Sequence, residues 1–139
     1  MKRLFKRTFK SDLLAAKRTA KEALMFTCEA VPSMTEDQIV DLRLVFNELL
    51  VNAVIHGNRY DQKKTVSIEI KIEDGCIHAR VSDEGMGFDY QKMVARWNLE
   101  GNLLDDHGRG VLLAYHITDG LKFRDKGKVI EFTKRLVGQ

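Results

Sequence analysis

The feature of this sequence that most constrains its fold is a nearly continuous apolar stretch from Leu44 to Ile55, which only Asn47, Glu48 and Asn52 interrupt. A helix turns by about 100° per residue, so the apolar positions of this stretch surround the helix almost completely. Most of the stretch must therefore be buried. A lone buried carboxylate costs roughly several kcal/mol unless it meets a counter-charge, a proton or a metal. The stretch predicts a central helix whose polar residues need partners.

Glu48 and Asn52 lie four residues apart and so stack on one face of this helix, and His56 continues the row by one turn. Two interpretations are open. In the first, the glutamate meets a lysine and the asparagine caps a loop. In the second, the strip presents oxygen ligands to a cavity, which suits Mg²⁺ because that ion takes few protein oxygens and completes its shell with phosphates and water. Glu48 would then orient or deprotonate an attacking hydroxyl, whereas a histidine at a helix end serves more often as a cap.

The remaining patterns predict a single domain over residues 1–139. In the first half of the chain, the patterns predict a strand over 1–10 and a helix from an N-cap at Ser11 to about Ala30. They then predict the central helix, which begins at a capping box of Thr35 and Gln38, runs to His56 and has Gly57 as its left-handed stop. The second half predicts strands over 65–72 and 77–81 around an Asp74-Gly75 hairpin, a short helix from 88 to 97 with a mobile loop after it, a helix opening at 108–110, and a hairpin of 121–124 with 129–134. Together these elements predict an α/β two-layer sandwich with an antiparallel-rich sheet.

The segment Asp83-Glu84-Gly85-Met86-Gly87 directly follows a predicted strand. Paired glycines there let the backbone approach a planar or anionic ligand closely. An aspartate at the strand end accepts a hydrogen bond from an exocyclic amine, which favours adenine over guanine. The alternative is a tight turn in which Asp83 is an ordinary turn residue.

The segment Gly108-Arg109-Gly110 stands directly before an apolar helix. Free backbone N–H groups and the positive end of the helix dipole would both favour an anion at this point, and Arg109 would add a forked donor to a phosphate. The alternative is a flexible helix entry with a solvated arginine.

Several familiar classes of site are excluded by what the sequence lacks. Gly127-Lys128-Val129 is not a P-loop because the upstream glycine and the Ser/Thr are absent, and neither glycine pair gains the third small residue of a dinucleotide fingerprint. Cys28 and Cys76 have the spacing of neither a disulfide scaffold nor a zinc site, and no serine lies in a nucleophile elbow. The net charge of +3 is too small to indicate a nucleic-acid partner.

The first ten residues are basic, and a solvated edge strand explains them more simply than an arm for nucleic acid or lipid headgroups. No apolar segment of a signal peptide follows them, and no apolar run approaches the ~20 residues needed to cross a bilayer. We therefore expect a cytoplasmic protein.

The order of the motifs is more specific than any of them alone: Glu-x-x-x-Asn on a buried helix, Asp-x-Gly-x-Gly, then Gly-x-Gly opening a helix. This order resembles the nucleotide-binding domain shared by gyrase, the histidine kinases, MutL and the ninety-kilodalton heat-shock chaperone, the GHKL superfamily. Three segments look closer still to the bacterial anti-sigma-factor serine-protein kinases: ELLVNAVIHGN at 48–58, DEGMGFD at 83–89 and HGRGV at 107–111. The resemblance extends over roughly residues 5–136.

The resemblance implies a Bergerat-type fold, in which helices cover one face of a mixed, mainly antiparallel sheet, and it implies ATP and Mg²⁺ as ligands. By position in the motifs, Asn52 corresponds to the Mg²⁺ ligand, Glu48 to the catalytic base and Asp83 to the contact with the adenine amine. The other residues that it assigns to the nucleotide pocket are Gly85, Gly87, Gly108, Arg109, Gly110, His56, Asn58 and, on the last strand beside adenine, Thr133. Residues 88–107 correspond to a lid that orders over bound nucleotide.

The resemblance also implies protein partners, namely a sigma factor and an anti-anti-sigma antagonist of the STAS type on which a serine is phosphorylated. Three functions remain open: such a protein-serine kinase, an ATP-dependent protein-binding switch of the same fold without significant kinase activity, and a nucleic-acid or surface binder that uses the basic N-terminus. Glu48 on the Asn52 face motivates the first, and the third leaves the buried polar strip unexplained. We therefore expect neither direct nucleic-acid binding nor membrane binding, and leave open whether the chain forms a homodimer.

Overall fold

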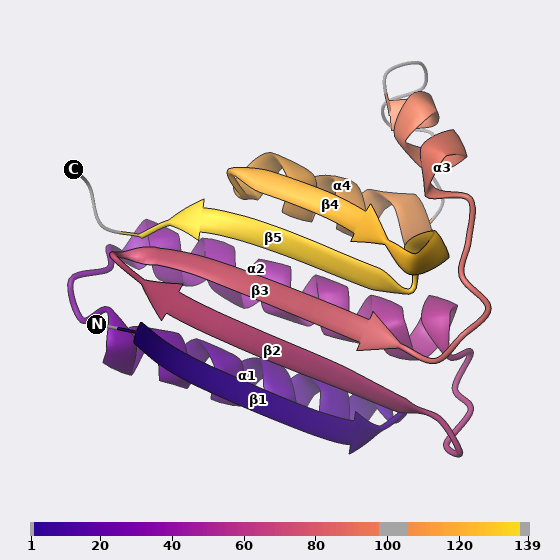
Figure 1. The fold of residues 1–139 in the computed structure, drawn as a ribbon, viewed down its shortest axis with the longest axis horizontal. Helices are drawn as coiled ribbons and strands as arrows, with labels where there is room; N and C mark the ends of the chain where they lie inside the picture. Colours follow the sequence, from indigo (N-terminus) through magenta and orange to yellow (C-terminus); the bar gives the residue numbers. More distant parts are fainter. Residues whose placement is uncertain (1, 98–105, 137–139) are drawn as a thin grey trace.

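The computed structural model describes residues 2–97 and 106–136, which form one sheet with helices on one of its faces (Figure 1). The sheet has five strands in the order β1-β2-β3-β5-β4, and each neighbouring pair is antiparallel. The strands are β1 (Lys2–Lys10), β2 (Thr65–Glu73), β3 (Cys76–Asp83), β4 (Gly120–Arg124) and β5 (Val129–Arg135). The helices are α1 (Leu13–Ala30), α2 (Glu36–Asn52), α3 (Tyr90–Trp97) and α4 (Asp106–Ile117), with short turns η1 (Ala53–Gly57) and η3 (Asp125–Gly127). The expected two-layer α/β sandwich is confirmed, and its described strands are antiparallel throughout rather than mixed.

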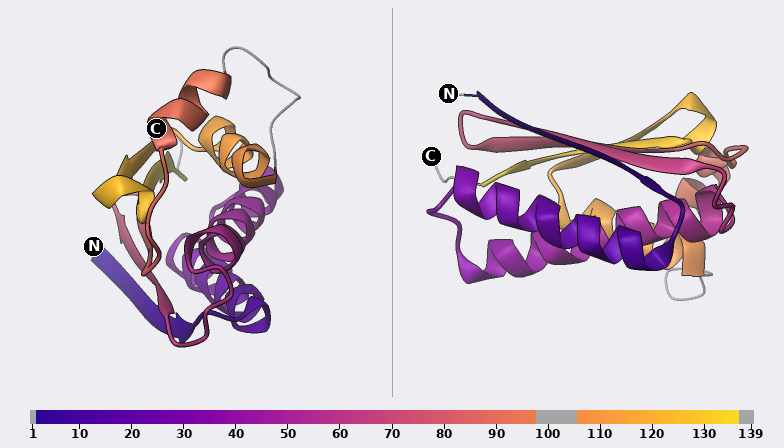
Figure 2. Two further views of the ribbon diagram at one scale, coloured as in Figure 1. Left: turned by 90° about the vertical axis from the view of Figure 1, so that its right-hand side faces the viewer. Right: turned by 90° about the horizontal axis from the view of Figure 1, so that it is seen from below.

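The layers are seen edge-on in Figure 2, where α1, α2 and α4 lie on the same side of the sheet. Helix α2 contacts both α1 and α4. Its side chains Val45, Phe46, Leu49 and Leu50 are each at most 1% exposed, which confirms the prediction of a buried central helix. Leu44 is 39% exposed, so the apolar collar around α2 is open on one side.

Strands β2 and β3 follow the predicted alternation. The even-numbered residues of β2 from Val66 to Ile72 are buried in the core, while the odd-numbered ones point to the other face. Asp74 and Gly75 both have positive φ, at 54° and 74°, as the tight turn of a two-residue hairpin requires. This turn sets the register in which Ile72 pairs with Ile77.

The starts of the first two helices differ in how well the sequence indicated them. The capping box of α2 is present as predicted, with Thr35 and Gln38 each accepting a hydrogen bond from the backbone N–H of the other. The N-cap of α1 is Asp12 and not Ser11, because Oδ2 of Asp12 accepts from the N–H of Ala15 at 3.1 Å. The N–H of Ser11 instead donates to the carbonyl of Lys64, which holds Ser11 next to the start of β2.

The end of the central helix also differs from the expectation. The α-helical hydrogen bonds stop at Asn52, and η1 continues as a π-turn in which the N–H of Asn58 donates to the carbonyl of Ala53 at 2.8 Å. Gly57 is therefore not a left-handed helix stop; the residues with positive φ after the turn are Arg59 and Tyr60, at 52° and 61°. Glycine is required at position 57 because a β-carbon there would collide with the carboxylate of Asp83 at the end of β3.

The other predicted elements are found with small shifts. The basic first segment is the edge strand β1, and α3 ends at Trp97 as expected. The predicted mobile loop after α3 lies largely in 98–105, outside the described residues. The hairpin of β4 and β5 turns at Gly127, whose φ is 89°. No helix in the described part of the chain is long and apolar enough to span a membrane.

The capping box at the start of α2 gives a first prediction. Thr35→Ala removes the hydroxyl that accepts from the N–H of Gln38 and should lower the free energy of unfolding by about 1 kcal/mol in urea denaturation followed by circular dichroism. Thr35→Ser keeps the hydroxyl and is the matched control, so its stability should stay close to wild type. Equal losses in the two variants would show that the cap does not stabilise the helix.

Candidate functional site

The polar strip of α2 meets the first turns of α4 at Glu48. A β-carbon built on Gly110 would lie 2.1 Å from Oε2 of Glu48, a distance that no real β-carbon contact tolerates. The absence of a side chain at Gly110 therefore leaves the space that the carboxylate occupies beside α4. The structure thus brings together one residue from each of two motifs that are far apart in the sequence.

Asp83 lies at the end of β3 against the backbone of two glycines. A β-carbon on Gly57 would lie 2.3 Å from Oδ2 of Asp83, and one on Gly85 would lie 1.9 Å from the carbonyl oxygen of Gly57. Oδ1 of Asp83 accepts a hydrogen bond from the N–H of Gly85 at 2.8 Å. The glycines of this loop were predicted to let the backbone approach a ligand closely. In the structure, the close approach is between segments of the protein itself, and it positions the Asp83 carboxylate.

Asn58 ties together the segments around Asp83. It is 1% exposed; its Oδ1 accepts from the N–H of Glu84 at 2.8 Å, and its Nδ2 donates to the carbonyl of Thr65 at 2.9 Å. Glu84 in turn accepts from the N–H and the hydroxyl of Thr65. Asn58 lies near the candidate site as expected, and both ends of its amide hold the protein's own loops.

The turn between β4 and β5 supports the glycine loop, a role that the sequence analysis missed. Gly87 has φ of 83°, and a β-carbon there would lie 2.3 Å from the carbonyl oxygen of Lys126. The N–H of Phe88 donates to that same oxygen at 2.8 Å. A β-carbon on Gly127 would lie 2.7 Å from the ring of Phe88. Glycine at 127 signalled a turn, but no local pattern indicates which segment a turn will contact.

Asn52 is the last residue of α2 and is half-buried, one turn beyond Glu48. The π-turn begins directly after it and spaces side chains differently from an α-helix. His56 is half-buried within this wider turn, so the α-helical spacing that placed it in a row with Glu48 and Asn52 does not apply there. π-turns occur frequently at functional sites, and this one lies between the polar strip and the Asp83 loop.

The three residues Gly108, Arg109 and Gly110 lie inside α4 rather than before it, because the helix begins at Asp106. Gly108 is buried and Arg109 is exposed. The first four N–H groups of a helix have no carbonyl partner within it, and the helix dipole is positive there. The helix therefore starts two residues earlier than expected, and anion binding at this end stays a prediction.

Thr133 lies away from this group of residues. Phe132 of β5 points into the core, so Thr133 points to the face of the sheet that the helices do not cover, where it pairs with His78 of β3. Asp83 follows Val81 in the alternation of β3 and lies on the helix side. The structure therefore does not bring Thr133 to Asp83, contrary to the expectation.

The two neighbouring carboxyls of the glycine loop have opposite electrostatics. Burial raises the pKa of Asp83, and this effect exceeds the lowering by the N–H of Gly85 and by the positive charges of Lys128 and Lys64. The hydrogen bonds from Thr65 lower the pKa of Glu84, whose side chain is exposed. A partly desolvated acceptor makes a stronger hydrogen bond to a ligand donor than one in water does.

The donors near α2 suit a metal that arrives with its own ligands. Among the described residues, no group of three or more His, Cys, Asp and Glu side chains is placed to hold a metal ion. Asn52 and Glu48 offer one neutral and one anionic oxygen-bearing group, and Mg²⁺ bound to phosphates needs few protein ligands. These residues therefore fit a nucleotide-borne ion and not an all-protein metal cage. Two grooves on the described surface lie elsewhere, on the uncovered face of the sheet and between α3 and β4.

Comparison with known proteins finds a matching family model and several relatives. Residues 11–134 match the family model of the histidine kinase-like ATPase domain. The chain is 43% identical over 53 residues to an anti-sigma F factor of Geobacillus stearothermophilus, an alignment that covers 38% of this chain and only 36% of that relative. It is 27% identical over 105 residues to an anti-sigma F factor of Clostridium botulinum, with 73% of each chain covered. For an anti-sigma F factor of Bacillus licheniformis the identity is 25% over 115 residues, with 80% of this chain and 77% of the relative covered.

The raised pKa of Asp83 predicts a specific pH dependence of stability. A carboxyl whose pKa is higher in the folded than in the unfolded protein stabilises the fold fully below its unfolded pKa, and this stabilisation is lost as the pH rises through the folded pKa. Asp83→Asn keeps an oxygen for the N–H of Gly85 and does not ionise. Relative to wild type, its free energy of unfolding should therefore increase between about pH 4 and pH 7.

The neighbouring substitution Glu84→Gln is the control of opposite sign. The lowered pKa of Glu84 stabilises the fold above its unfolded pKa of 4.5, so this variant should lose stability relative to wild type as the pH rises to that value, and the difference should stay constant from there to pH 7. Urea denaturation at several pH values measures both differences. A parallel response of the two variants would contradict the assignment of burial as the dominant effect at Asp83.

Proposed function

The chain belongs to the histidine kinase-like ATPase family, and from this premise we propose that it is an ATP-binding regulator of a sigma factor. Membership of an ATPase family implies ATP binding. The relatives reported above are anti-sigma F factors, which supports the regulatory role. The single observation that carries the proposal is the contact of Glu48 with Gly110, because it sets a carboxylate of the buried helix beside the dipole-positive end of α4.

The adenine end of the ligand is assigned to the Asp83 loop. Oδ2 of Asp83 is the acceptor for the exocyclic amine, since Oδ1 already accepts from the N–H of Gly85. Gly85 and Gly87 give a planar ring close access to the backbone. Asn58 holds the loop in this shape through Glu84, and we assign His56, which lies in the π-turn, to the border of the pocket.

The phosphate end is assigned to α4 and to the polar strip of α2. Gly108 and Arg109 lie in the first turn of α4, where the helix dipole favours the phosphates and the guanidinium adds a charged donor, and Gly110 leaves room beside them. Asn52 supplies a neutral oxygen to Mg²⁺, which when bound neutralises phosphate charge. In the kinase form of the proposal, Glu48 orients the serine hydroxyl of a protein substrate and accepts its proton as the phosphoryl group is transferred.

The proposed partners are a sigma factor, which the chain would sequester, and an anti-anti-sigma antagonist of the STAS type that carries the serine. The alternative is an ATP-dependent protein-binding switch without significant kinase activity. Glu48 favours the kinase, because a binding switch requires Asn52 and the helix end but no base. We expect the protein to act in the cytoplasm, without nucleic acid or membrane as a direct partner, and a homodimer remains compatible with this role.

ATP binding gives the first test of the proposal. Asn52→Ala removes the proposed Mg²⁺ ligand and should weaken Mg-ATP binding at least about tenfold in calorimetric titration, while changing binding in the presence of EDTA little. Asn47→Ala is the matched control on the same helix, because the Asn47 side chain donates to the carbonyl of Arg43 on an exposed surface. Failure of wild-type protein to bind ATP with or without Mg²⁺ would overturn the proposed function.

Phosphoryl transfer separates the kinase from the switch. Glu48→Gln keeps the shape of the side chain but not its basicity, so it should lower the rate of antagonist serine phosphorylation by about 100-fold with ATP affinity nearly unchanged. Glu29→Gln on the exposed side of α1 is the control. The readout is phosphoserine by mass spectrometry on a candidate anti-anti-sigma protein. Wild-type protein that binds ATP and the antagonist yet forms no phosphoserine would support the switch instead.

A further inference from the structure

The face of the sheet opposite the helices is uncovered in the described structure (Figures 1 and 2). Because side chains alternate along a strand, this face receives the residues that lie between the buried ones on all five strands. The strand register aligns Lys6, Glu69, Arg80, Glu131 and Lys122 in one row across the sheet. The face is thus charged rather than apolar.

The charges on this face are strongly unbalanced. Its strand residues include eight lysines and arginines but only three glutamates, Glu69, Glu73 and Glu131. The face therefore carries an excess of five positive charges, whereas the whole chain carries +3. The rest of the protein is slightly acidic. A concentration of one sign on one face attracts partners of the opposite sign and repels a second copy of the same face.

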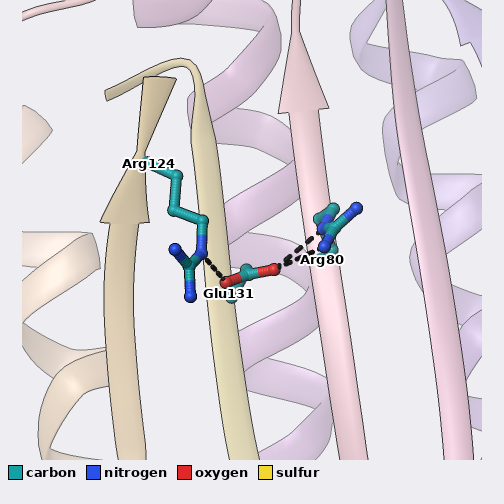
Figure 3. A network of polar contacts seen from close by, with 3 residues as sticks. All are labelled: Arg80, Arg124 and Glu131. Carbon is teal, nitrogen blue, oxygen red and sulfur yellow. Dashed lines mark hydrogen bonds and ion pairs between the residues drawn. The ribbon is translucent and has the colours of Figure 1, made fainter. Parts of the chain in front are cut away.

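Two arginines on this face are held in place by one glutamate (Figure 3). Nε of Arg80 donates to Oε2 of Glu131 at 2.8 Å, and Nε of Arg124 donates to Oε1. The arginine side chains are 54% and 59% exposed, while that of Glu131 is 21% exposed. The hydrogen bond from Arg124 lowers the pKa of Glu131, so the group keeps one uncancelled positive charge at neutral pH. Guanidinium groups that are already oriented lose less freedom when they bind an anion.

These arginines border an open groove of about 540 Å³ on the same face. The groove runs across the sheet from Leu4 and Lys6 on β1 to Lys122 and Arg124 on β4. Leu4 is 66% exposed and offers one apolar contact within this basic surface. The groove lies on the other side of the sheet from Glu48, Asn52 and Asp83, so its occupant would not compete with a ligand at the candidate site.

We propose that the uncovered face of the sheet is a docking surface for an extended acidic segment of a protein partner, whose carboxylates pair with Arg80, Arg124 and the flanking lysines. The spacing of the charges favours a polypeptide over a uniform polyanion, because Glu69 and Glu131 stand between the cations and would repel a continuous row of phosphates. The strand residues on this face include His78 but no phenylalanine, tyrosine or tryptophan on which bases could stack; Phe5 and Phe132 are buried on the helix side. The surface goes beyond the ATP-dependent function and does not depend on it.

The test uses the full chain and a fluorescein-labelled peptide of alternating glutamate and serine. About eight residues suffice, since five strands at ~4.8 Å spacing span ~19 Å and an extended chain covers ~3.3 Å per residue. Lys6→Glu combined with Lys122→Glu reverses charge at both ends of the groove and leaves Arg80, Arg124 and Glu131 unsubstituted, although residue 122 is the cross-strand partner of Glu131. In fluorescence anisotropy at low salt, this variant should bind the peptide at least about tenfold more weakly than wild type, and wild-type binding should weaken as salt is added.

The matched control is Lys17→Glu combined with Lys21→Glu, which makes the same change in net charge on exposed positions of α1. It should change peptide affinity less than about twofold, because the peptide is bound by the face and not by overall charge. Equal weakening in the two double variants would overturn the proposal. Circular dichroism of both variants verifies that each is folded.

Three further measurements identify a wrong occupant. Tighter binding of an oligothymidylate, or of phosphatidylglycerol vesicles, that the face variant abolishes would replace the protein partner by nucleic acid or membrane. A dimer in light scattering that the face variant dissociates would assign the face to a second copy.

Asn52→Ala should retain peptide binding while it loses Mg-ATP binding. Wild-type protein that binds ATP but not the peptide would overturn this inference and leave the proposed function standing, whereas wild-type protein that binds the peptide but not ATP would do the reverse.

Discussion

The candidate site depends on close approach of oxygen atoms to glycine backbone. At Gly57, Gly85 and Gly110 a β-carbon would lie 2.3, 1.9 and 2.1 Å from an oxygen of Asp83, Gly57 and Glu48, respectively. Any side chain at these positions would push a carboxylate or a loop out of place. The missing side chains therefore position the two carboxylates as much as hydrogen bonds do. Helix α2 contacts α4, and its extension η1 contacts β3, so that both approaches occur on the same helix and its extension.

The elements that the sequence predicts best are those whose cause is local. The alternation of β2 and the Asp74-Gly75 turn both act within a few residues, and the structure contains both. The capping box at Thr35 is equally local. The burial of α2 was also predictable, because a helix with apolar residues on almost all sides would expose a large apolar area to water at the protein surface. Its polar residues Glu48 and Asn52 are the basis of the predicted site, which stays a prediction.

The features that could not be predicted depend on contacts between distant segments. Gly57 resembles a helix stop in sequence, but its requirement arises from the carboxylate of Asp83 on another element. The face on which Thr133 lies follows from strand register, which a one-residue difference in the last strand would invert. Ser11 lost the cap position to Asp12 because its own backbone bonds to Lys64. In each case local preference was real, and a tertiary contact decided the outcome.

The support of the glycine loop by the β4–β5 turn has a consequence for how the site assembles. The N–H of Phe88 donates a hydrogen bond to the carbonyl of Lys126, and the N–H of Asp83 donates one to the carbonyl of Lys128. The loop that follows β3 therefore lacks these hydrogen-bond partners until the hairpin of β4 and β5 has joined the sheet. During synthesis the central helix and the first hairpin emerge well before that moment. The candidate site thus takes its final shape only after β5 has joined the sheet, although the residues predicted to bind the ligand lie earlier in the chain.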